Sequence, residues 1–131
     1  MSRERRPPER NDHSAKKAVW QGIKDLLISG SLEITSGHAI DAHDFAALLP
    51  AGMSVYVHHP ASHRLAQSHA ALKAIRAAGL EPVPHIAARR IASRVELESF
   101  LERATGDSGV SKVLLTGGDV PQSLGPYSSG A

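Results

Sequence analysis

Residues 53–59 read MSVYVHH, and this stretch decides the fold because its β-branched side chains are typical of a strand. Three further stretches have the same character: SLEITS (31–36), PVPHIAA (82–88) and SKVLLTG (111–117). Between them the apolar residues recur at helical spacing. Strands that alternate with helices predict βαβ units and a parallel sheet, which is an α/β fold with four strands.

The helices expected between these strands have recognisable ends. Ser14 is suited to cap the first helix, and Gly30 is placed to end it. A short helix is expected over 40–49, and a longer one over 60–78. The last helix is opened by Ser93 and Glu96, which form a capping box, and extends to about residue 104. Its expected buried residues are Val95, Phe100 and Leu101.

The amino-acid composition limits the classes of protein to which the chain can belong. The chain has 131 residues, of which 41% are hydrophobic and 21% charged, so it is globular. Aromatic residues make up only 4%, so the core must consist mainly of aliphatic side chains. The absence of cysteine excludes disulfide scaffolds, thiolate metal sites, iron–sulfur clusters and cysteine nucleophiles. No apolar run approaches the ~20 residues of a membrane span, so no membrane partner is expected.

The basic charge of the chain is confined to its first residues. Removing the four arginines and two glutamates of residues 1–10 from totals of 15 basic and 13 acidic side chains leaves 11 of each. We therefore expect a disordered basic tail over 1–13, a neutral folded unit over 14–131, and no nucleic-acid partner. The tail has no apolar signal segment, which favours a cytoplasmic protein.

Each predicted strand has a polar residue within it or directly after it. Parallel strands bring their carboxyl ends to one edge, so Glu33, His58, His85 and Asp119 are expected to gather there. Two placements of Glu33 remain open. On an inner sheet face its pKa would rise and suit a general acid, whereas on the outer side of an edge strand it would simply be solvated.

The histidines and glycines at this edge also have structural interpretations. His58 and His59 are adjacent on a strand and must point to opposite faces, so they cannot share one metal ion, and no metal site is expected. A lone buried His85 is more often structural than catalytic. Gly117 and Gly118 let the backbone approach a ligand closely, but they also suit an ordinary turn between a buried strand and a helix.

Four segments in order, SLEITSG, SVYVHHP, EPVPHIAAR and VLLTGGDVPQSLGPYSS, resemble the methylenetetrahydrofolate reductase family. The resemblance covers most of 31–131 and implies the first half of a TIM-type (β/α)8 barrel that binds FAD. It also implies that Glu33 is the general acid and that Asp119 tunes the flavin and holds the folate. The implied cofactor-binding residues are His58, His85, Thr116, Gly117, Gly118, Asp119 and Tyr127. The family commonly has an arginine at the position of Gly117 and a threonine at that of His58.

The implied reaction is the flavin-dependent reduction of 5,10-methylenetetrahydrofolate to the 5-methyl form with NAD(P)H, in methionine biosynthesis or a demethylation pathway. A complete barrel needs ~250 residues, so the chain is expected to act as part of a longer enzyme. The open edges of a half-barrel also favour pairing into a homo-oligomer. The alternatives are a non-catalytic protein that binds folate or flavin, and an inactive truncated fragment.

Overall fold

The structure is a computed structural model that describes residues 12–36, 44 and 46–129. The expected tail up to residue 11 and half of the expected helix over 40–49 (residues 40–43 and 45) lie outside the described residues. The elements in order are α1 (Asp12–Ser29), β1 (Leu32–Thr35), β2 (Ser54–His58), the 3-10 turn η2 (Leu65–Ser68), α3 (His69–Ala77), β3 (Glu81–Ala87), the 3-10 turn η3 (Ala88–Arg90), α4 (Arg94–Ser108) and β4 (Leu114–Thr116).

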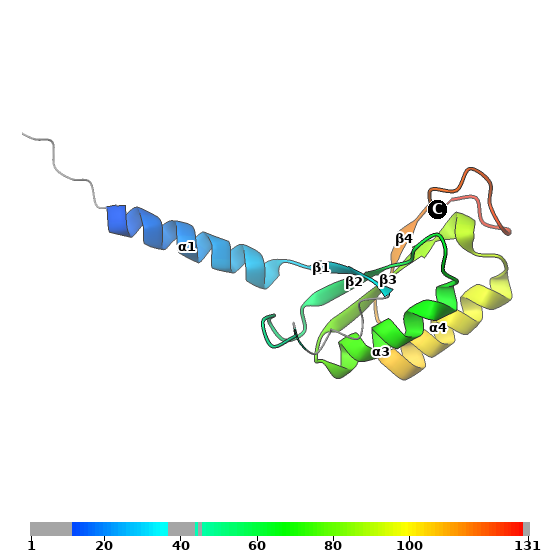
Figure 1. The fold of residues 1–131 in the computed structure, drawn as a ribbon, viewed down its shortest axis with the longest axis horizontal. Coiled ribbons are helices and arrows are strands. Elements are labelled where there is room, and N and C mark those ends of the chain that lie inside the picture. Colours follow the sequence, from blue (N-terminus) through cyan, green and yellow to red (C-terminus); the bar gives the residue numbers. More distant parts are fainter. Residues whose placement is uncertain (1–11, 37–43, 45, 130–131) are drawn as a thin grey trace, which may run out of the picture.

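The four strands form one parallel sheet in the order β1-β2-β3-β4, which confirms the predicted α/β fold. Neighbouring strands are also neighbours in sequence, so every crossover moves one step in the same direction. The register pairs Glu33 with Tyr56 and Thr35 with His58. Helices α3 and α4 lie side by side against one face of the sheet (Figure 1). We call the opposite side of the sheet the open face.

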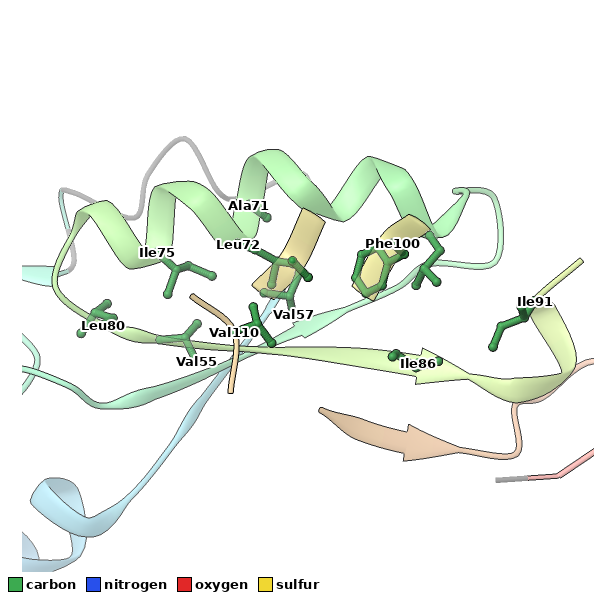
Figure 2. Packing of buried hydrophobic residues seen from close by; sticks show 12 residues of the cluster. Val55, Val57, Ala71, Leu72, Ile75, Leu80, Ile86, Ile91, Phe100 and Val110 are labelled. Atoms are coloured by element: carbon green, nitrogen blue, oxygen red, sulfur yellow. The ribbon is translucent and has the colours of Figure 1, made fainter. Parts of the chain in front are cut away.

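The hydrophobic core lies between the sheet and these two helices (Figure 2). Val55 and Val57 point from β2 toward Leu72 and Ile75 of α3, and all four side chains are fully buried. Phe100 of α4 is an aromatic residue in this cluster, which is otherwise aliphatic as the composition predicted. Burying each of these large side chains contributes about 1.5–3 kcal/mol, so the core fixes the sheet and positions its edge.

The helix boundaries differ from the prediction in three places. The first helix begins at Asp12 rather than Ser14, so residues 12 and 13 belong to it and not to the tail. The third begins only at His69, because the chain after Pro60 makes a turn and then η2. The last continues to Ser108, where Gly109 ends it with a φ of 57°.

Two predictions of burial are wrong. Val95 is exposed because it lies on the outer side of α4, whereas Phe100 is buried and Leu101 partly so. All three side chains of β4 are exposed, although this segment was expected to be a buried strand. In the part of the chain that the structure describes, no helix follows β4 to cover it.

Helix α1 stands apart from this body and projects beyond β1 (Figure 1). Its side chains from residue 13 onward are exposed, including Val19, Trp20 and Leu26. None of the helices in the described ranges has the length and apolar character needed to cross a membrane.

Candidate functional site

The open face of the sheet carries a cluster of polar side chains contributed by three strands. The His85 ring on β3 lies edge-on to the rings of Tyr56 and His58 on β2, with centroid distances of 5.9 and 5.7 Å. Glu33 reaches in from β1, and its Oε2 lies 3.6 Å from Nε2 of His85. Three of the four residues expected at this edge are therefore within reach of one another.

A hollow of about 410 Å³ opens at the carboxyl ends of β2, β3 and β4. The predicted site residues that line it are His58, His85, Thr116, Gly118 and Asp119. Three further residues complete its wall: His59, Ala87 and Arg90. The strand ends thus converge on one cavity, as parallel topology predicts.

Glu33 lies on the open face, but its side chain is 61% exposed. The described residues therefore leave its carboxylate largely in contact with solvent. His85 is more enclosed, and its Nε2 is buried without a hydrogen-bond partner among the described residues. Burial lowers the pKa of His85, Glu33 raises it, and His58 lowers it further. The neutral imidazole is accordingly favoured, with an unused nitrogen beside a carboxylate.

Asp119 is held by a residue that sequence reasoning did not select. Arg90 pairs with its carboxylate through Nη2 and donates from Nη1 to the His59 carbonyl oxygen at 2.7 Å. The arginine side chain is only 8% exposed, whereas that of Asp119 is 75% exposed. The hydrogen bond from Arg90 is the main reason that the pKa of Asp119 is lowered. Asp119 is therefore an ionised, fixed carboxylate at the rim of the hollow.

Gly118 has a backbone conformation that requires glycine. Its φ is 92°, and a Cβ atom there would lie 3.4 Å from Cβ of Ala87. At the preceding residue the carbonyl of Gly117 accepts from the backbone N–H of Arg89 at 3.0 Å. Arg89 also donates from Nε to the Ser128 carbonyl at 2.8 Å, which ties down the loop after β4. These contacts hold the turn that presents Asp119.

His59 lies one residue beyond the end of β2, and it lines the same hollow as His58. It is buried, and its Nε2 contacts the carbonyl oxygen of His63. Burial lowers the pKa of His59, the hydrogen bond to His63 raises it, and the nearby charge of Arg90 lowers it. His59 is therefore a neutral side chain in the wall of the hollow, linked to the His63 carbonyl oxygen.

Two predicted cofactor-binding residues do not line the hollow. Tyr127 packs against the hydrophobic core instead, and Gly117 contributes only backbone to the turn. Among the residues that the structure describes, no group of three or more His, Asp or Glu side chains is placed to hold a metal ion.

The position of Arg90 in the sequence could have indicated its contact with Asp119, but the sequence alone could not distinguish Arg90 from Arg89. Arg90 follows β3 at the carboxyl edge, and Asp119 follows the neighbouring strand, so parallel topology brings these opposite charges together. The adjacent Arg89 was an equally good candidate for the contact with Asp119. Only the fold shows that Arg90 makes this contact and that Arg89 donates to the Ser128 carbonyl instead.

No protein-family model matches the chain. The interpretation of the site therefore depends on its chemistry. A hollow that combines imidazoles, a buried guanidinium and a fixed carboxylate suits a polar ligand with both hydrogen-bond donors and acceptors.

Proposed function

We propose that this chain supplies part of a flavin-dependent site that reduces 5,10-methylenetetrahydrofolate to 5-methyltetrahydrofolate, with NAD(P)H as the reductant. The observation that carries the proposal is that His58, His85 and Asp119 line one hollow at the carboxyl edge of a parallel sheet, with Glu33 beside His85. These are the positions at which the resemblance to methylenetetrahydrofolate reductases implies acid, cofactor and folate contacts.

The strand order also supports the proposal. Four parallel strands in sequential order, with α3 and α4 on one side, are what the first half of a (β/α)8 barrel requires. In such barrels the reaction takes place at the carboxyl ends of the strands, where the hollow lies. The open face would then be the inside of the barrel.

The residues around the hollow fit a flavin ring. The cavity volume of about 410 Å³ falls in the range of small-molecule pockets. Gly118 lacks a side chain where a flat ligand would approach. His58, His85 and the Thr116–Asp119 turn would hold the ring.

Bound FAD would supply the hydride-transfer chemistry, with electrons from NAD(P)H. The task of Glu33 is to hold a proton and deliver it to the folate nitrogen that leaves when the imidazolidine ring opens. His85, with Nε2 at 3.6 Å from that carboxylate, would orient Glu33 and exchange the proton with it. Asp119 would contribute a fixed negative charge, since Arg90 keeps it ionised.

Arg90 also accounts for one departure from the family pattern. The family commonly has an arginine at the position of Gly117, and here the guanidinium beside Asp119 comes from the preceding loop instead. The charge balance at the rim of the hollow would therefore be preserved although the residue that provides it has changed.

The test separates proton delivery from flavin reduction. We would measure NAD(P)H oxidation by the FAD-supplemented protein, once with the folate and once with menadione as the electron acceptor. The Glu33→Gln variant should lower the folate rate by about 10²-fold or more and leave the menadione rate unchanged. Glu98→Gln, on the outer side of α4, is the matched control and should alter neither rate.

The results distinguish this function from its alternatives. Equal folate rates in the wild type and Glu33→Gln would remove the general-acid role. Flavin or folate binding without turnover would identify a non-catalytic binding protein, a candidate favoured by the 61% exposure of the Glu33 side chain. An absence of both binding and turnover would support an inactive chain.

A further inference from the structure

Glu33 and His85 belong to strands that are not neighbours in the sheet. Strand β2 lies between β1 and β3, and adjacent strands are about 4.8 Å apart, so the two backbones are separated by about 10 Å. Nevertheless, Oε2 of Glu33 lies 3.6 Å from Nε2 of His85. The glutamate side chain must therefore extend across β2, on the open face, to reach the imidazole.

The register of the strands shows where Glu33 crosses β2. The Cα partner of Glu33 on β2 is Tyr56. The register of β2 with β3 sets His85 beside His58, which is two residues further along β2. Side chains two residues apart on a strand share a face and are about 7 Å apart along it. Glu33 therefore crosses β2 diagonally, from the level of Tyr56 to that of His58.

The rings of Tyr56 and His58 come before and after this crossing along β2. Both residues are half-buried, and the alternating burial of β2 places them on the same face. The His85 ring lies edge-on to each of them, with interplanar angles of 76° and 85°. Three rings thus surround the point at which the Glu33 carboxylate meets the imidazole.

Glu33 is a side chain that needs such support. It belongs to β1, which is the edge strand of the sheet, and it is 61% exposed. An exposed glutamate has considerable rotational freedom, which it loses when its carboxylate is held in one place. A broad ring beside the crossing excludes the rotamers in which the carboxylate turns back toward the amino end of β2. Tyr56 is the residue placed to do this.

We propose that Tyr56 is a positioning residue, whose ring holds the Glu33 carboxylate against Nε2 of His85. His58 bounds the crossing on its other side and also lines the hollow. The inference deepens the proposed function and rests on it for its catalytic meaning, because a carboxylate kept at that nitrogen is where the proton would be held before its delivery to the folate. The position of the carboxylate itself can be measured without folate or flavin.

The pKa of His85, followed by NMR titration of the isotope-labelled 131-residue chain, reports this contact. Glu33 raises the pKa of His85 and the nearby His58 lowers it, so Glu33→Gln should lower it in the wild-type background. The same substitution should change the pKa much less in Tyr56→Val, because valine suits a strand but is too short to bound the crossing. Tyr56→Phe keeps the ring and should restore the full effect. Ser54→Ala, on the same face of β2 but on the side away from the crossing, is the matched control and should also keep it.

Three results of this titration would refute the proposal. The first is an effect of Glu33→Gln that is as large in Tyr56→Val as in the wild type. The second is a loss of the effect in Tyr56→Phe, and the third is a wild type in which Glu33→Gln leaves the pKa of His85 unchanged.

The wild-type chain supplies a second test, which holds even where Tyr56→Val does not fold. Nuclear Overhauser effects should connect the Cγ protons of Glu33 with the ring protons of both Tyr56 and His58. Their absence at either ring would overturn the proposal.

The catalytic consequence is measured with the folate and menadione assays. A reacting group displaced by about 1 Å can slow a reaction on the order of 10²-fold, so Tyr56→Val should lower kcat with the folate by at least about 10-fold and leave the menadione rate unchanged. Equal losses with both acceptors would make Tyr56 a structural or flavin contact and contradict its role toward Glu33. If the chain reduces no folate while the His85 titration behaves as expected, the proposed function fails and the positioning of Glu33 by Tyr56 stands.

Discussion

Replacing Arg90 by leucine tests how the edge of the sheet is held. The variant removes the hydrogen bond from Nη1 to the His59 carbonyl, 2.7 Å long and made by a side chain that is only 8% exposed. A hydrogen bond from a charged donor contributes about 1.5–3 kcal/mol, so the free energy of unfolding should fall by about that amount. The ion pair with Asp119 should contribute little stability, since that carboxylate is exposed to water.

Two assays follow from this reasoning. Urea unfolding should show the loss of stability in Arg90→Leu, whereas Arg94→Leu, which removes an exposed pair with Glu98, should change it by less than about 0.5 kcal/mol. Carboxyl NMR titration should show the pKa of Asp119 rising toward its ordinary value once the guanidinium is gone. Equal stability of the two variants, or an unchanged pKa of Asp119, would refute the assigned role of Arg90.

Three further predictions concern the core, the turn and the histidines. Leu72→Ala removes a fully buried side chain and should lower the free energy of unfolding by about 2–5 kcal/mol in urea; a loss below about 1 kcal/mol would contradict the core as described. In the same assay Gly118→Ala should lower the free energy of unfolding by about 1–3 kcal/mol, because the φ of Gly118 is 92°. Gly117→Ala should lower it by less, because there is open space around Gly117. A larger loss for Gly117→Ala than for Gly118→Ala would contradict the turn as described. Burial lowers the pKa of His59 and His85 in the folded chain, so the unfolded chain binds more protons below about pH 6.5. Their contribution to stability is present above that pH and is lost as the pH falls; unfolding curves that are unchanged between about pH 7.5 and 5.5 would contradict this.

The sequence predicted the elements that depend on local chemistry. The β-branched alternation of MSVYVHH placed a strand within one residue of each end of β2. Ser93 caps α4 by accepting from the backbone N–H of Glu96 at 3.1 Å, as the capping-box spacing indicated. Such features are set by residues close in sequence, so one chain is enough to find them.

What the sequence did not predict depends on which elements become neighbours. Val95 is apolar at helical spacing, but it is exposed because α4 presents Phe100 to the sheet. Strand β4 is apolar yet exposed, since burial requires a covering helix as well as a suitable pattern. The Arg90 contact joins two loops that are 29 residues apart, and only the strand order brings them together.

Tyr127 is another residue whose surroundings in the fold the sequence did not predict. The resemblance placed it against the cofactor, whereas the structure packs it against the core. A single aromatic residue in a loop carries no information about the direction in which it points. By contrast, His58, His85 and Asp119 were selected because they lie within, at the end of or just after a strand, and the hollow includes all three.

The central claim is that the hollow at the carboxyl edge of the sheet binds the flavin ring. An NMR titration of the isotope-labelled chain with FAD tests it directly, because even weak binding shifts the backbone signals of contacting residues. We predict that the largest shifts occur at His58, His85 and the turn from Thr116 to Asp119, with the outer side of α4 unaffected. Shifts that are absent at saturating flavin, or that map to the outer side of α3 and α4, would contradict the claim.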